Sequence, residues 1–421
     1  MSLQSINLYS QLAKNKLFKK SVNFDLSRIK LALKKLGSPE KKLKNVINVI
    51  GSDGKYSVLT SLKFFIEANK EKTSAYISPS LKDIKERFWI GKRFLKHYEI
   101  KNTIKIIEKT KISLTTFEVL TLIFILNVFK RNNNYNLIEA GALFAKDSTN
   151  VFDKPLIQIV TNINKQHLNF VKKKTLNEII KQKVGFLSNS TNIYIGKQKP
   201  STLSSIKRIL KKNKSKKIFS NSWNLLKFKK NYYYIDKKTK IKIISNNIFS
   251  RGLMDNLALA IKIALDLGIN KKIIQKTIPK IFFEGRVHYL KKGKIKKKLN
   301  KNEQLLLDGA HSEVSGRNLS NYLKKIKGIK YGIWGMTKNK NPHQFIKQFK
   351  GIFKKIITIP IQDEANSLSA KTLSKIAKTN KFKAESSKNI FEALKKIKKE
   401  KKKIVIIFGS LYLIANILNK S

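Results

Sequence analysis

The chain has 421 residues, which is long enough for two or three domains, each with a buried core. It contains no cysteine, and this excludes disulfides, thiolate catalysis and cysteine-ligated zinc or iron. The formal net charge is +64, but the lysines are spread along the whole chain and only eight arginines occur. Base readout and bidentate phosphate contacts favour clustered arginine, so we expect weak steering toward anionic substrates and no nucleic-acid partner.

Two apolar stretches, residues 112–129 and 404–418, raise the question of a membrane span. The first contains Glu118 and Asn127, and the second is short and interrupted by Gly409-Ser410. The N-terminus also lacks a basic region followed by an apolar run. We therefore expect both stretches to be core elements of a cytoplasmic protein that has no membrane partner.

Strands and helices alternate along the chain. A helix over residues 25–36 ends at Gly37-Ser-Pro39, and a strand over residues 46–50 follows. Further strands are expected at 74–77, 136–139 and 156–162, and further helices at 114–129, 176–183 and 255–267. The lysine-rich residues 197–242 predict a small β insertion. Later strands are expected at 304–307, 330–333, 355–359 and 403–408, and later helices at 315–326, 341–353, 370–379 and after the last strand.

The stretch Val46-Ile-Asn-Val-Ile-Gly-Ser-Asp-Gly-Lys-Tyr-Ser57 has the strand-loop-helix context that a phosphate-binding loop requires. In such a loop, backbone N–H groups at a helix start bind anionic oxygens, a lysine reaches the outer phosphates, and a hydroxyl holds Mg²⁺. Val49 occupies the first glycine position of the strict pattern. An ordinary turn that contains a lysine is therefore an open alternative.

Strand-helix alternation predicts parallel sheets covered by helices, with ligands at the carboxyl ends of the strands. We predict an α/β protein in which residues 1–282 form an N-terminal P-loop ATPase-type domain with a parallel-rich sheet. Residues 283–421 form a smaller C-terminal Rossmann-like α/β domain. Residues 284–302 carry a weak pattern and are expected to be the hinge.

Several motifs, in this order, resemble the folylpolyglutamate synthase / dihydrofolate synthase family of the Mur-ligase type. The resemblance covers nearly the whole chain, and its collective specificity comes from the order of the motifs. They are Gly51-Ser-Asp-Gly-Lys-Tyr-Ser57, Ser78-Pro-Ser-Leu81 with Glu86-Arg87, Thr115-Thr-Phe-Glu118, residues 139–151, His167, Gln182-Lys-Val-Gly-Phe186, Glu284-Gly-Arg286, Leu307-Asp-Gly-Ala-His-Ser312 and residues 409–413.

The chain also departs from the family pattern. Tyr56 replaces a glycine and Asp53 an asparagine in the phosphate loop, and Leu143-Phe-Ala145 replaces Gly-Gly-Arg. Other differences lie at Ser80, Asn339, Asn341 and Gly252-Leu253. They affect adenine and pterin contacts more than the charged groups of phosphoryl transfer, so we expect an active, divergent enzyme.

The resemblance implies an ATP-dependent ligase. ATP would phosphorylate a carboxylate of dihydropteroate or a folate, and the amine of L-glutamate would attack the acyl phosphate. The implied catalytic residues are Lys55, Lys183, Arg286 and His311. The implied ATP contacts are Gly51, Ser52, Asp53, Gly54, Lys55, Ser57, Asn256, Arg286, Asp308 and His311.

The resemblance also implies two Mg²⁺ sites. Ser57 and Glu139 would hold the first ion, and His167 and Lys183 the second, with Lys183 converted by CO₂ into an anionic carbamate. Taken without the resemblance, His167 and Lys183 are typical of surface residues. The implied substrate contacts are Ser78, Pro79, Arg87 and Asp147. The protein is expected to be a monomer.

Two other interpretations stay open from the sequence. A peptidoglycan-type amino-acid ligase shares the ATP-binding domain, although residues 25–39, Ser78-Pro79 and 409–413 favour the folate branch. A nucleic-acid-binding ATPase would account for the charge of +64.

Overall fold

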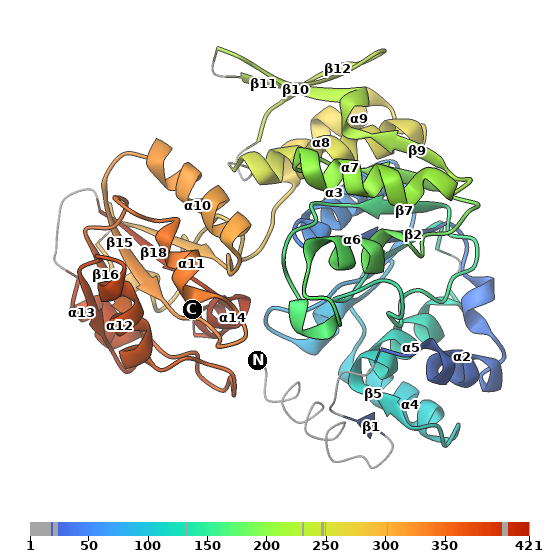
Figure 1. Ribbon diagram of the computed structural model, residues 1–421, viewed down its shortest axis with the longest axis horizontal. Helices are drawn as coiled ribbons and strands as arrows, with labels where there is room; N and C mark the ends of the chain where they lie inside the picture. Colours follow the sequence, from blue (N-terminus) through green and yellow to red (C-terminus); the bar gives the residue numbers. More distant parts are fainter. Residues whose placement is uncertain are drawn as a thin grey trace. The chain divides into compact units, whose positions relative to one another are not determined.

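The computed structural model describes the backbone of residues 18–19 and, in full, residues 24–131, 133–229, 231–245, 248, 250–300, 302–397 and 403–420. The chain forms two compact units (Figure 1). The N-terminal unit comprises residues 2–245 and 253–281, and the C-terminal unit residues 246–252 and 282–421. The chain crosses between the two units after residues 245, 252 and 281.

The N-terminal unit is built on a seven-stranded sheet in the order β4-β3-β6-β2-β7-β8-β9. All neighbouring strands are parallel except the pair β3-β4. Strand β2 lies in the middle and is buried along its whole length, as its run of β-branched residues predicts. The strands are β2 (Val46–Ile50), β3 (Thr73–Tyr76), β4 (Phe88–Ile90), β6 (Tyr135–Glu139), β7 (Ile157–Val160), β8 (Asn192–Ile195) and β9 (Lys216–Phe219).

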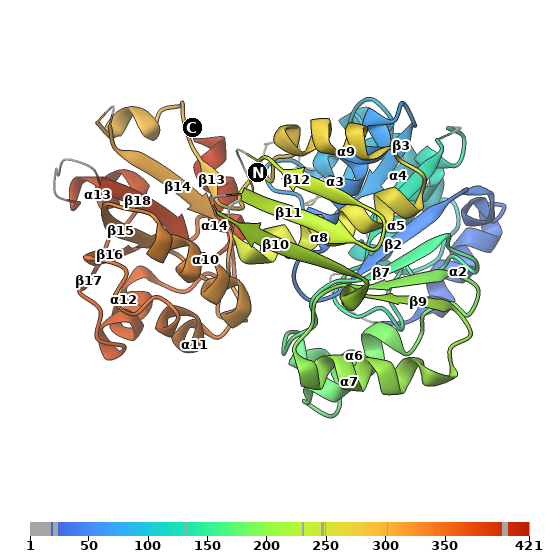
Figure 2. The same cartoon turned by 90° about the horizontal axis from the view of Figure 1, so that it is seen from above.

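Helices cover both faces of this sheet. Figure 2 shows α6 and α7 on one side of the strands and α3 and α9 on the other. Helix α3 contacts β2, β3 and β6, and it packs against α9. The helices are α2 (Leu26–Lys35), α3 (Lys55–Ala68), α4 (His97–Glu108), α5 (Thr116–Val128), α6 (Leu176–Val184), α7 (Pro200–Ile209), α8 (Arg251–Asp266) and α9 (Lys271–Thr277).

The predicted β insertion is real but shorter than expected. Strands β10 (Trp223–Phe228), β11 (Asn231–Asp236) and β12 (Lys240–Ile243) form a three-stranded antiparallel sheet. The first part of the lysine-rich region instead forms α7 and β9, which belong to the main α/β layers. Its exposed lysines obscured the helical and strand patterns.

The C-terminal unit contains a six-stranded sheet in the order β13-β14-β18-β15-β16-β17. All pairs are parallel except β13-β14. The strands are β13 (His288–Tyr289), β14 (Gln304–Asp308), β15 (Ile329–Trp334), β16 (Lys355–Thr358), β17 (Ala384–Ser386) and β18 (Lys403–Phe408). The helices are α10 (Glu313–Lys325), α11 (Pro342–Lys347), α12 (Ala370–Thr379), α13 (Ile390–Lys395) and α14 (Leu411–Asn419).

The predicted α/β class with parallel-rich sheets is confirmed. Both apolar stretches are core elements, because α5 and β18 are almost completely buried. Within the described part of the chain, no helix has the length and apolarity needed to cross a membrane. The helix expected over 341–353 is wrong in its second half, since α11 ends at Lys347 and Gly351 adopts a left-handed φ of 74°.

Candidate active site

The phosphate-loop candidate connects the end of β2 with the start of α3. Gly51 has a φ of 148° and Gly54 a φ of 95°, and both conformations favour glycine. Gly54 caps α3 without a side-chain hydrogen bond, and the first turn of α3 contains no acidic residue. The N–H groups at this helix start are therefore suited to an anionic ligand.

A second loop, residues 161–166 after β7, holds the phosphate loop in place. The backbone N–H groups of Ser52 and Asp53 donate to the carbonyl of Asn162, at 2.8 and 3.2 Å. The Asp53 carboxylate accepts from the side-chain amides of Asn164 at 2.7 Å and Gln166 at 3.1 Å. Asp53 thus fixes the loop through two neutral donors.

Four predicted nucleotide and metal residues meet at the loop. Lys55 Nζ donates to the carbonyl of Gly51 at 3.3 Å and lies 3.8 Å from Oε1 of Glu139, at the end of β6. Ser57 Oγ donates to the carbonyl of Gly54 at 2.9 Å and accepts from the side-chain amide of Asn256 at 2.8 Å. The buried Ser57 and Glu139 provide a hydroxyl and a carboxylate, donors that suit a hard cation.

The buried side chain of Lys183, on α6, extends to the same loop. Its side chain is 1% exposed, and Nζ donates to the carbonyls of Gly51 and Ala142 at 2.8 and 2.5 Å. Burial and the neighbouring Lys55 lower the pKa of Lys183 to about 7, against the opposing effect of Asp147 and Asp53. A buried lysine with this pKa has a large neutral fraction near neutral pH.

The predicted substrate residues lie near the end of β3 and in the loop after β6. Arg87 donates to the hydroxyl of Ser78 at 3.1 Å, and the N–H of Ser78 donates to Glu139 at 3.1 Å. Pro79 is exposed. The buried Asp147 accepts from the N–H of Gly141 at 3.0 Å and from Thr149, and burial raises its pKa. The Asp147 carboxylate therefore also stabilises the loop after β6, in which it lies.

His167 lies in the loop after β7 with a left-handed φ of 61°, and its ring stacks on Phe170. Within the described ranges, no group of three or more histidine, aspartate or glutamate side chains could hold a metal. The second Mg²⁺ site therefore depends on a chemical change at Lys183 and stays a prediction.

The remaining predicted residues belong to the C-terminal unit. Asp308 ends β14, and its two carboxylate oxygens accept from the N–H groups of Val287 and Ala310, both at 2.8 Å. Burial raises the pKa of Asp308. A Cβ on Gly309 would lie 2.9 Å from Nη1 of Arg286, so the guanidinium packs over this glycine. His311 Nδ1 lies 2.8 Å from the carbonyl of Gly309.

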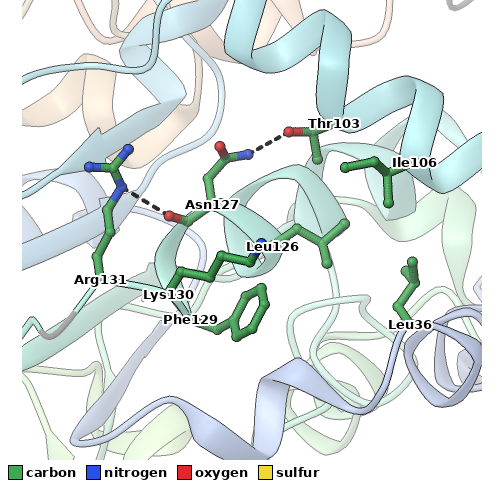
Figure 3. Close-up of a pocket in the computed structure, with 8 residues that line it drawn as sticks. All are labelled: Leu36, Thr103, Ile106, Leu126, Asn127, Phe129, Lys130 and Arg131. Carbon is green, nitrogen blue, oxygen red and sulfur yellow. Dashed lines mark hydrogen bonds between the residues drawn. The ribbon is translucent and has the colours of Figure 1, made fainter.

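A pocket of about 560 Å³ lies elsewhere in the N-terminal unit, between α4 and α5 (Figure 3). Polar side chains hydrogen-bond within the pocket lining, to another side chain or to a backbone carbonyl. Asn127 donates to Thr103 at 2.8 Å, and Arg131 donates to the carbonyl of Asn127 at 3.0 Å. None of its lining residues belongs to the predicted site. They are Leu36, Thr103, Ile106, Leu126, Asn127, Phe129, Lys130 and Arg131.

The sequence interpretation missed Asn162, Asn164 and Gln166. A run of polar residues directly after a buried strand was the available signal. Two of the contacts use the backbone carbonyl of Asn162. Every residue type has a backbone carbonyl, so the side-chain pattern gave little indication of these contacts.

Comparison with known proteins gives a consistent result. Residues 291–420 match the family model of the dihydrofolate synthetase C-terminal domain. The chain is 23% identical over 417 residues to a dihydrofolate synthase/folylpolyglutamate synthase of Buchnera aphidicola, covering 96% of this chain and 94% of that protein. A probable dihydrofolate synthetase of Schizosaccharomyces pombe is 26% identical over 155 residues, or 36% of this chain and 37% of that protein.

Solved structures share the whole fold. E. coli FolC in complex with DHPP and ADP superposes with a TM-score of 0.86 at 20% identity, covering 98% of this chain and 97% of that chain. Folylpolyglutamate synthase of Mycobacterium tuberculosis, complexed with ADP and AMPPCP, gives 0.86 at 15% identity, covering 99% and 98%. At these identities the structures establish the fold.

Proposed function

The chain belongs to the folylpolyglutamate synthase / dihydrofolate synthase family, and we propose that it is an ATP-dependent ligase that joins L-glutamate to dihydropteroate, to a folate, or to both. The observation that carries the proposal is the group at the end of β2. There Lys55, Ser57 and Glu139 surround a helix start that is suited to phosphate.

The reaction would proceed in two steps. A substrate carboxylate attacks the γ-phosphorus of ATP, which releases ADP and leaves an acyl phosphate. The amine of glutamate then attacks the acyl carbon, phosphate leaves, and the amine loses a proton. The protein contributes position and charge, so Lys55 and the N–H groups of α3 would bind phosphate oxygens.

Ser57 and Glu139 would hold Mg²⁺, which supplies positive charge next to the phosphates when it is bound. Asn256 positions the Ser57 hydroxyl through its hydrogen bond. In the C-terminal unit, Arg286 and His311 would contact nucleotide phosphates, and the family resemblance implies a ribose contact for Asp308. Ser78, Pro79, Arg87 and Asp147 would line the path of the pterin substrate.

We propose that Lys183 carries a carbamate when the enzyme is active. A neutral amine attacks CO₂ and loses a proton, and the result is an anionic oxygen donor. The pKa of about 7 supports this step, because it leaves a neutral fraction at physiological pH. The carbamate and His167 would then serve the second Mg²⁺. A ¹³C carbamate resonance in protein equilibrated with ¹³CO₂, absent from Lys183→Ala, would support the proposal, and its absence from the parent protein would contradict it.

The test of the function is a ligation assay with the purified full chain, ATP, Mg²⁺ and labelled glutamate. Dihydropteroate and tetrahydrofolate are offered separately, and a UDP-linked muramyl acceptor serves as the comparison. Product with either pterin supports the proposal. Product with the muramyl acceptor alone, or ATP hydrolysis stimulated by nucleic acid alone, would contradict it.

We further propose a cytoplasmic monomer that acts on small molecules and binds no nucleic acid. Light scattering on the full chain is expected to give a mass near 48.4 kDa. Because electrostatic binding weakens with salt, retention on heparin is expected to disappear at physiological ionic strength. A dimer mass, or retention that persists in salt, would contradict this part of the proposal.

A further inference from the structure

The segment that carries Arg286 has an unusual backbone. The N–H of Arg286 donates to the carbonyl of Phe283 at 3.1 Å, which closes a turn with Gly285 at a φ of 71°. The next residue, Val287, also has a positive φ, of 46°. A β-branched residue rarely adopts this conformation, because it is sterically strained. Surrounding contacts must therefore hold Val287 in place.

Asp308 supplies that contact. Strands β13 and β14 pair antiparallel with His288 opposite Leu307, so Val287 and Asp308 are the next residues of the two strands. Oδ2 of Asp308 accepts from the N–H of Val287 at 2.8 Å. Asp308 is 6% exposed and Val287 5%, so water competes little for this bond.

The other oxygen of Asp308 organises the facing turn. Oδ1 accepts from the N–H of Ala310 at 2.8 Å, and the N–H of Gly309 donates to the carbonyl of Gly285 at 2.8 Å. One carboxylate thus ties the turn of Arg286 to the turn of Gly309, over which the guanidinium packs.

We propose that Asp308 is a positioning residue for Arg286: its carboxylate holds the left-handed conformation of Val287 and thereby directs the guanidinium. This inference rests on the proposed ligase function, in which Arg286 contacts the nucleotide phosphates. It differs from the ribose contact that the family resemblance implies, because Asp308 acts on turnover through the backbone of residues 285–287.

The first measurement needs no catalysis. In the full chain, amide hydrogen exchange at Val287 is expected to be at least about tenfold faster in Asp308→Ala than in the parent, because the acceptor is lost. Unchanged exchange at Val287 would overturn the proposal. If the parent chain makes no pteroyl or folyl glutamate product, the ligase function fails, while this measurement still reports on the turn.

Kinetics then test the link to Arg286. Asp308→Ala is expected to lower kcat about tenfold or more. The double variant with Arg286→Ala should be no more than about twofold slower than Arg286→Ala alone, because both changes remove one effect. If the two substitutions lower kcat by independent factors that multiply in the double variant, a role of Asp308 through Arg286 is contradicted.

A matched pair of variants tests the backbone itself. Val287→Gly and Val287→Ala both delete the buried side chain, but only glycine adopts a positive φ without steric cost. In the Asp308→Ala background, Val287→Gly is expected to turn over at least about threefold faster than Val287→Ala. Equal rates would show that Asp308 does not act through this conformation.

A direct contact between Asp308 and the ribose would give a different kinetic result. With 2′,3′-dideoxy-ATP, which lacks both hydroxyls, a ribose contact is already absent, so Asp308→Ala would cause little further loss. The positioning role predicts the same fold loss in kcat with ATP and with the dideoxy analogue. A loss confined to ATP would overturn the proposal.

Discussion

Two lysine side chains converge on one backbone oxygen in the N-terminal unit. Lys55 and Lys183 both donate to the carbonyl of Gly51, at 3.3 and 2.8 Å. Lys183 is the more deeply buried of the two, and the charge of Lys55 contributes to its lowered pKa. Lys183 is therefore a lysine that readily loses its proton, and Lys55 is the one that we propose for phosphate binding.

The first prediction concerns Lys55. Lys55→Ala is expected to lower ligation at least about a hundredfold with little loss of stability, because it removes positive charge from the phosphate position. The matched control is Lys63→Ala, which removes a lysine two turns further along α3, where Nζ pairs with Glu67 at 2.9 Å. Turnover of the control should stay within about twofold of the parent. Equal activity of Lys55→Ala and the control would show that this loop is not the ATP site.

The second prediction concerns pH. The pKa of Lys183 falls from 10.5 to about 7 on folding, so the unfolded chain binds this proton more tightly. Protonation of the unfolded state therefore favours unfolding, and the contribution of Lys183 to the free energy of unfolding should rise from about pH 7 to about pH 10. Denaturant titrations in CO₂-free buffer would compare the parent with Lys183→Met. A difference between them that does not change with pH would show that Lys183 has an ordinary pKa in the fold.

At the scale of elements, the start of α3 depends on close packing against α8. A Cβ on Gly54 would lie 2.6 Å from the side-chain amide of Asn256, which holds the Ser57 hydroxyl. The geometry of the phosphate loop is thus set by a helix that comes about 200 residues later in the chain.

The third prediction compares two glycines with similar backbones. Gly268, at the end of α8, has a φ of 84° and open space around a Cβ. Gly268→Ala should cost about 1 kcal/mol of stability and leave nucleotide affinity unchanged. Gly54→Ala should cost about 1–3 kcal/mol and weaken nucleotide binding at least about tenfold, because it displaces Asn256. Calorimetric titration with ADP would measure both, and equal affinities would refute the role of this contact.

The strength of the hydrophobic pattern decides which elements could be predicted. Strand 403–408 and helix 370–379 have the predicted bounds, because one is a continuous apolar run and the other a clear amphipathic repeat. Strands β8, β13 and β17 have two to four residues each, too few for a period to emerge. Helix α5 begins two residues later than expected, since Thr115 accepts from the N–H of Glu118 and so caps it.

The candidate site was predictable only where side chains carry the signal. Lys55 and Ser57 follow from the strand-loop-helix context, and the structure places Glu139 and Lys183 beside them. Sequence could not foresee that Lys183 is buried or that its partners are carbonyls of Gly51 and Ala142. Every residue has a backbone carbonyl, so residue types do not reveal which carbonyls accept hydrogen bonds.

At the scale of the whole molecule, positive charge greatly exceeds negative charge. The chain carries 90 basic and 26 acidic residues, so folding brings like charges together. Most of the described ion pairs are at least partly exposed and contribute little individually, although Lys403 and Glu303 form a buried pair at 3.0 Å. Self-repulsion therefore opposes the compact state.

The fourth prediction follows from this repulsion. Raising NaCl from about 0.05 to about 0.3 M should increase Tm, because the Debye length shortens and repulsion between lysines is screened. The same change should raise the KM for ATP, since long-range attraction of the anionic substrate is weakened. Differential scanning calorimetry and initial rates would measure the two effects. A Tm that falls with added salt would show that attractive pairs dominate.

The position of β18 in the C-terminal sheet has a consequence for how the protein is made. This strand lies between β14 and β15, yet the ribosome synthesises it about 70–100 residues after them. Until residues 403–408 emerge, β14 and β15 each present an unpaired edge, and Asp308 ends a strand that has no parallel neighbour. Non-local pairing of this kind slows folding and exposes edges to other chains. The nascent C-terminal unit is therefore expected to depend on chaperones until its last strand is in place.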